Sequence, residues 1–148
     1  MKVTVLLRND HETFKSHFAK YRKPNTRNEN GKKELFEAVR REILLHSQME
    51  LEIFYPALQE TASIRAGELV AEARADHQKI EKLLEAVDPQ DRSFDAQMNE
   101  LIEAVEGHLE MEEAEIFEEA RKSLPEYRLE QLGLEVEERR RIAGNIAA

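Results

Sequence analysis

The sequence has no cysteine and no tryptophan, and it contains only five glycines and four prolines in 148 residues. Without cysteine there can be no disulfide bonds, no thiolate metal sites and no cysteine nucleophiles. Scarce glycine and proline, together with 36% charged residues, favour helices over a β-sandwich or a disordered chain. The length is sufficient for one main domain with a substantial core.

Positive charge is also scarce, because 22 lysines and arginines stand against 31 aspartates and glutamates, a formal net charge of −9. Such a surface repels phosphates, so we expect neither nucleic acid nor an anionic membrane as a partner. Long apolar runs are missing as well. The N-terminal run in MKVTVLLRND ends at Arg8, too early for a signal peptide or a membrane span. We therefore expect a soluble, cytoplasmic protein.

What the sequence does contain is apolar residues at steps of three and four, the spacing of amphipathic helices. A loop rich in Asn, Pro and Gly is expected at residues 23–31. A more polar helix is expected after Pro125. The four amphipathic segments cover about residues 3–22, 32–55, 64–87 and 93–122, with Pro56 bending the second or starting a new helical turn.

Long helices joined by short connections pack as antiparallel neighbours. We therefore predict an all-α fold, an up-down-up-down antiparallel four-helix bundle with a C-terminal helical extension. The bundle is expected to cover residues 1–122. Residues 123–148 are expected to form the extension, which either packs on the bundle or trails from it.

Each of the four apolar stripes also contains polar residues, which occur at the same helical spacing as the apolar ones. Each of the four segments has one inward-facing histidine, and in two of them a glutamate follows one turn later. Heights along the helices, at about 1.5 Å per residue, place the four histidines within roughly one turn of each other. Because burying unpaired polar groups is costly, something must satisfy them. The side chains expected to meet in one layer are His11, His46, Glu50, His77, His108 and Glu112.

A single His–Glu pair four residues apart is ordinarily a helix-surface ion pair, and a lone buried histidine is ordinarily just hydrogen-bonded. Two such pairs and two further histidines at one depth favour a metal site instead. Imidazoles with carboxylates able to bridge suit two non-haem irons or manganese ions. A mononuclear tetrahedral zinc site would leave part of the donor set unused.

The segments LLRNDHETFKSHF, LHSQMELEIFYPAL, ARADHQKI and VEGHLEMEEAEIF, in this order over about residues 1–120, resemble the hemerythrin-like family of HHE cation-binding domains. The resemblance implies a pair of iron ions with an oxo or hydroxo bridge, and manganese or zinc is the weaker alternative. It implies a small ligand such as O2, H2O2 or NO. By similarity, one iron is bound by His11 and His46, the other by His77 and His108, and both are bridged by Glu50 and Glu112.

The chain departs from oxygen-carrying hemerythrins at two points. Those proteins have a further histidine one turn before the third-helix histidine, where this chain has Ala73. Their fourth-helix carboxylate is an Asp five residues after its histidine, where this chain has the HxxxE spacing. Glu81 is the first candidate to replace the missing imidazole, ahead of Asp76 and Glu113. The missing histidine leaves a coordination position open, which favours peroxide, nitric oxide or iron chemistry over reversible oxygen carriage.

Three functions stay open at this stage: a binding module for oxygen or nitric oxide, an enzyme or iron protein, and a metal-free structural bundle. The second class includes catalase-like peroxide consumption, ferrous oxidation, and iron storage or sensing. Phe14 and Phe54 are expected to wall the layer from water. Tyr55 is a candidate hydrogen-bond donor to the layer, although its phase on the stripe is poorer, and His17 is expected to be a surface histidine.

Overall fold

The computed structural model describes residues 1–23 and 29–147, so most of the predicted loop, including Pro24, lies outside the described residues. Within them there is no strand, and the all-helical prediction is confirmed. The elements are α1 (Val3–Arg22), α2 (Glu29–Met49), η1 (Glu50–Phe54), α3 (Tyr55–Gln59), α4 (Ile64–Ala86), α5 (Phe94–Met111), η2 (Glu112–Ile116), α6 (Phe117–Ser123) and α7 (Glu126–Ala147).

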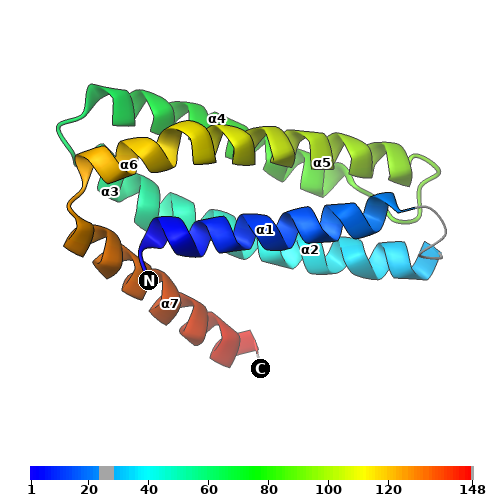
Figure 1. Cartoon of the computed structure of the whole chain (residues 1–148). Coiled ribbons are helices and arrows are strands. Elements are labelled where there is room, and N and C mark those ends of the chain that lie inside the picture. Colours follow the sequence, from blue (N-terminus) through cyan, green and yellow to red (C-terminus); the bar gives the residue numbers. More distant parts are fainter. Residues whose placement is uncertain (24–28, 148) are drawn as a thin grey trace.

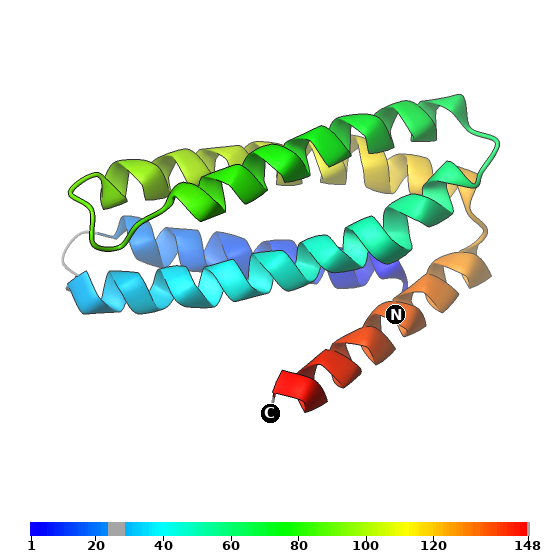
Figure 2. The same ribbon diagram turned by 180° about the vertical axis from the view of Figure 1, so that it is seen from behind.

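Several of these elements follow one another without a break. α2, η1 and α3 form one continuous rod, and α5, η2 and α6 form another. With α1 and α4 they make four rods that lie side by side in both views (Figures 1 and 2). The second rod begins at Glu29, earlier than the expected Lys32, so Asn30 and Gly31 are helical and not part of a loop.

The layer of polar side chains separates the apolar core into two clusters. On α1, Leu7 belongs to one cluster and Phe14 to the other, and the buried His11 stands between them. Fully burying one large apolar side chain stabilises a protein by about 1.5–3 kcal/mol. Leu58 and Leu101, at most 1% exposed, provide such burial in the first and the second cluster respectively. The bundle therefore has apolar packing on both sides of its polar layer.

The last helix, α7, crosses one end of the bundle at an angle to the rods (Figure 1). Leu129, Leu132 and Val136 on its inner face are buried in the first cluster, while Tyr127 and Leu134 are exposed. The C-terminal extension therefore packs on the bundle and does not trail from it. No helix in the described part of the chain combines the length and hydropathy that a membrane crossing requires.

Candidate metal centre

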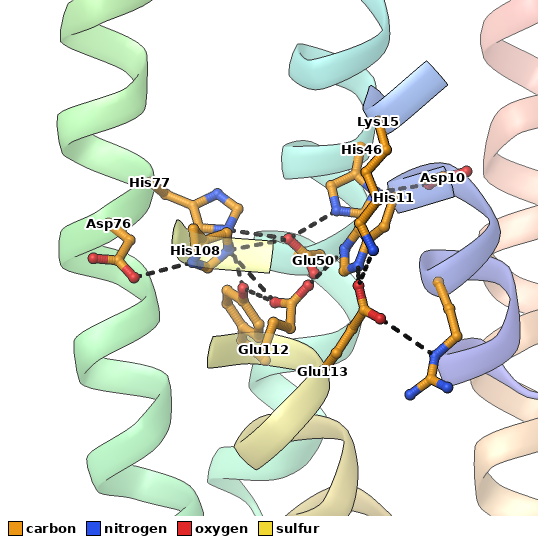
Figure 3. A network of polar contacts seen from close by, with 12 residues as sticks. Asp10, His11, Lys15, His46, Glu50, Asp76, His77, His108, Glu112 and Glu113 are labelled. Atoms are coloured by element: carbon orange, nitrogen blue, oxygen red, sulfur yellow. Dashed lines mark hydrogen bonds and ion pairs between the residues drawn. The ribbon is translucent and has the colours of Figure 1, made fainter. Parts of the chain in front are cut away.

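The structure brings together the six side chains singled out in the sequence, and all six are buried (Figure 3). Their donor atoms form two groups, and within each group these atoms lie within 4.8 Å of one another. Both groups contain Glu50 and Glu112. The first group adds His11 and His46, and the second adds His77 and His108.

The inward-facing ring nitrogens surround the two carboxylates at short range. Oε1 of Glu50 lies 3.2 Å from Nε2 of His46 and 3.1 Å from Nε2 of His77. Oε1 of Glu112 lies 3.0 Å from Nε2 of His11, and its Oε2 lies 3.6 Å from Nε2 of His108. Each carboxylate therefore approaches histidines of both groups, which is the arrangement that bridging of two cations requires.

Most of these inward atoms have no hydrogen-bond partner among the described residues, although they are close together. They are Nε2 of His11, His46 and His108, both carboxylate oxygens of Glu50, and Oε1 of Glu112. Leaving so many buried polar atoms unpaired is costly, and native proteins avoid it. Imidazole nitrogens and carboxylate oxygens arranged around shared points form a donor set that fits first-row transition metals. The residues present thus fit a pair of cations.

Two π-helical turns shape the layer, and each begins at one of the shared carboxylates. In η1 the backbone N–H of Tyr55 donates to the carbonyl of Glu50, and in η2 that of Phe117 donates to the carbonyl of Glu112. Such turns insert one extra residue into a helix and are frequent at functional sites. Pro56 follows η1, but no proline follows η2, so proline alone does not account for both turns.

The η1 turn brings Tyr55 into the layer, where it makes the hydrogen bond considered from the sequence despite its poorer phase in an unbroken α-helix. Tyr55 is fully buried, its hydroxyl donates to Oε2 of Glu112 at 2.5 Å, and the hydroxyl oxygen lies 3.0 Å from Nε2 of His77. Burial and the charges of Glu112 and Glu50 raise the pKa of the Tyr55 hydroxyl, which keeps it protonated. Glu81, expected as the first substitute for the missing imidazole, is exposed. The oxygens near Nε2 of His77 are instead the Tyr55 hydroxyl and Oε1 of Glu50.

Three of the four histidines face a carboxylate with their outer nitrogen. Nδ1 of His46 lies 2.7 Å from Asp10, Nδ1 of His108 lies 3.0 Å from Asp76, and Nδ1 of His11 lies 3.0 Å from Glu113. Such partners fix the tautomer and orientation of metal-binding imidazoles. Asp76 and Glu113, considered from the sequence as substitute ligands, thus face the outer nitrogens of histidines instead. Asp10 was missed, although it directly precedes His11 in the sequence.

His77 differs from the other three histidines, because its Nδ1 has no partner among the residues that the structure describes. The two HxxxE blocks explain the difference. Glu113 follows Glu112 and faces His11, whereas Leu51 follows Glu50 and offers no acceptor. The two donor groups are therefore unequal at the outer nitrogens of their histidines. They also differ at the residue five positions after each shared glutamate, which is Tyr55 after Glu50 and Phe117 after Glu112.

The electrostatics of the layer favour positive charge. Burial would lower the pKa of His46, but the charge of Glu50 and the hydrogen bond to Asp10 raise it to about 10. Burial is likewise outweighed at His108, where Asp76 and Glu50 raise the pKa to about 10. The carboxylates thus attract positive charge to the layer, either as protons on histidine or as a cation.

Aromatic rings close the layer on the side of the first group. Phe117 stacks on His11 with ring centroids 5.6 Å apart, and Phe14 meets the ring of His46 edge-on at 5.2 Å. Phe54 packs against Phe117 and not against a histidine. His17 is partly buried, with Nε2 2.8 Å from Glu42, and it belongs to neither donor group.

Comparison with known proteins identifies the family and the fold of the chain. The hemerythrin HHE cation-binding domain matches residues 3–120, whereas no curated protein matches the sequence. The fold is similar to the crystal structure of a hemerythrin HHE cation-binding domain-containing protein from Mycobacterium kansasii. The TM-score is 0.78 at 22% identity, over 94% of this chain and 85% of that chain. The resemblance found in the sequence is confirmed, and the chain belongs to the hemerythrin HHE cation-binding domain family.

Proposed function

We propose that this protein binds a pair of non-haem iron ions in its polar layer and that the pair binds or reacts with O2, H2O2 or NO. The observation that carries the proposal is that two donor groups share both Glu50 and Glu112. One cation would be held by His11 and His46, and the other by the two histidines of the second group. The centre would form in an up-down-up-down bundle of residues 1–122, with residues 123–148 as its extension, in the cytoplasm.

The family match and the donor chemistry both support a cation site, and a set of six donor side chains that one tetrahedral zinc would not use in full favours a pair of irons. When bound, a ferrous pair would supply the electrons for reaction with peroxide or for capture of a diatomic ligand. The protein contributes geometry and exclusion of water. Glu50 and Glu112 hold the two positions together, and Asp10, Asp76 and Glu113 orient the histidine rings.

The test is metal analysis of the purified chain, with visible and near-ultraviolet spectra before and after reduction. The proposal predicts two irons per chain, one for each donor group, and an absorption band that bleaches on reduction. A colourless preparation that holds zinc would contradict iron as the metal. A preparation with well under one metal per chain, and no gain on anaerobic ferrous loading, would leave only the metal-free structural bundle.

A catalase-like activity is the second candidate function, and Tyr55 is the observation that favours it. A buried hydroxyl with a raised pKa keeps a proton beside His77 and Glu112, where a reacting oxygen ligand would need one. Oxygen release after peroxide is added to the iron-loaded protein tests this function. Repeated turnover would establish an enzyme, whereas a single binding event without turnover would favour a binding module.

A further inference from the structure

Arg140, on the C-terminal helix α7, contacts the carboxylate that faces one histidine of the polar layer. Its Nη1 and Nη2 atoms donate to the two carboxylate oxygens of Asp10, with Nη1 at 3.0 Å. Asp10 also faces Nδ1 of His46 at 2.7 Å. Three side chains from α7, α1 and α2 therefore form a continuous chain of polar contacts. This chain of contacts ends at the imidazole of His46, whose Nε2 lies 3.2 Å from Oε1 of Glu50.

The other two carboxylates that face an outer histidine nitrogen are Glu113 and Asp76. Each interacts with cationic side chains on one of the four rods. Glu113 lies 3.5 Å from Nζ of Lys15 and 3.9 Å from Nε of Arg8, both on α1. Asp76 interacts with the charge of Lys79, on its own helix. Among the described residues, Asp10 is thus the histidine-facing carboxylate whose cation comes from α7.

This contact is sheltered and has the geometry of a strong ion pair. The Arg140 side chain is 26% exposed and that of Asp10 is 19% exposed, whereas the neighbouring pair of Arg139 and Glu52 is 42% and 48% exposed. A guanidinium that donates to both oxygens of a carboxylate fixes its orientation as well as its charge. A hollow of about 240 Å³ lies next to it and is lined by His46 and Arg140 among others.

We propose that Arg140 is a positioning residue for the metal position of His11 and His46, and that it acts by holding Asp10 against His46. The inference rests on the proposed function. An imidazole whose Nδ1–H donates to a fixed carboxylate keeps Nε2 free and aimed at the metal. Because Asp10 is fixed in turn by Arg140, the docking of α7 sets how firmly this half of the centre retains its metal. The half with His77 and His108 has no contact of this kind with α7 among the described residues.

The experiment measures release of iron from the full-length protein, loaded anaerobically with ferrous iron, to an excess of a colorimetric ferrous chelator. In R140A, half of the bound iron should leave up to about 10-fold faster than in the wild type, the lower end of the effect of losing a histidine's direct partner, because Asp10 itself remains. The other half should leave at the wild-type rate. The matched control is R139A, which removes the exposed pair with Glu52 from the same helix and should release iron as the wild type does.

A double-mutant cycle separates positioning from a merely structural role of Arg140. D10N should itself speed release from the same half, and R140A added to D10N should bring no further acceleration. If R140A acts only by loosening α7, its effect persists in full on the D10N background, and that result would overturn the inference. R140Q, which keeps the length and a hydrogen-bonding end, replaces R140A in the cycle if R140A loses helix content.

The two proposals fail in different ways. A wild-type chain that takes up no iron overturns this inference together with the proposed function. A wild-type chain that fills both positions, with R140A releasing iron at the wild-type rates, overturns the inference alone.

Discussion

The hydroxyl oxygen of Tyr55 lies 3.0 Å from Nε2 of His77, in the buried polar layer between the rods. Five residues after Glu50 the chain has this tyrosine, whereas five residues after Glu112 it has Phe117, which stacks on His11. The two halves of the centre therefore differ by a hydroxyl group. We expect proton-dependent chemistry at the half with His77, and the first prediction concerns this hydroxyl.

Tyr55→Phe should keep the bound iron and lose most of the peroxide-consuming activity, by about 100-fold, because a positioned proton donor typically contributes that much or more. The free energy of unfolding should fall by about 1–3 kcal/mol, since removing the hydroxyl leaves Oε2 of Glu112 without this donor. Oxygen release from peroxide and urea denaturation measure the two effects. Tyr127→Phe, at an exposed tyrosine, is the control. An unchanged turnover rate in Tyr55→Phe would contradict the assigned role.

Substitutions of single ligands should affect the two metal positions differently. Glu112→Ala should remove iron from both positions, because Glu112 belongs to both donor groups. His46→Ala should reduce iron content by about half, since His46 belongs to the first group alone. His17→Ala, outside both groups, should leave iron content unchanged. Full iron content in both Glu112→Ala and His46→Ala would refute the ligand assignment.

The stability of the chelator-treated protein should fall as pH rises from 6.5 to 10. The pKa values of His46 and His108 are raised from 6.5 to about 10 in the folded chain. A raised folded-state pKa means that the folded chain binds protons more tightly than the unfolded chain. The resulting stability is complete below pH 6.5 and is lost as pH passes through 10. Thermal unfolding at pH 6, 8 and 10 checks this, and a midpoint that does not fall would contradict it.

Iron affinity should change with pH in the opposite direction. Metal binding requires deprotonated imidazoles, so protons compete with iron at His46 and His108. Chelator competition at pH 6 and pH 8 should therefore show weaker iron binding at the lower pH. Equal affinity at both values would indicate that these two nitrogens do not bind the metal.

The gathering of the six side chains in one layer could be predicted from the sequence because their spacing follows helical periodicity. His46 and Glu50 lie one turn apart on an apolar stripe, and so do His108 and Glu112, which places each pair inside a bundle. The same periodicity gives Tyr55 a poorer phase than the structure shows, although its hydrogen bond to the layer was considered from the sequence. A π-helical turn adds one residue between Glu50 and Tyr55, and no pattern in the sequence predicted that turn.

The carboxylates that face the outer histidine nitrogens were not predicted from this periodicity. Asp10 and Asp76 each precede a histidine, but adjacent residues on a helix point about 100° apart. Each aspartate therefore faces a histidine of the neighbouring rod, His46 or His108. The repeated Asp–His dipeptide was the signal that could have found them. Arg140 is 130 residues from Asp10, and no periodic pattern connects residues at that separation.

The measurement that tests the central claim most directly is an anaerobic ferrous titration of the full-length protein, followed by X-ray absorption at the iron edge. A centre whose two positions share Glu50 and Glu112 predicts saturation at two irons per chain. It also predicts an iron–iron distance of about 3.5–4 Å, as in other two-metal sites. Saturation at a single iron, or two irons without such a short iron–iron distance, would contradict it.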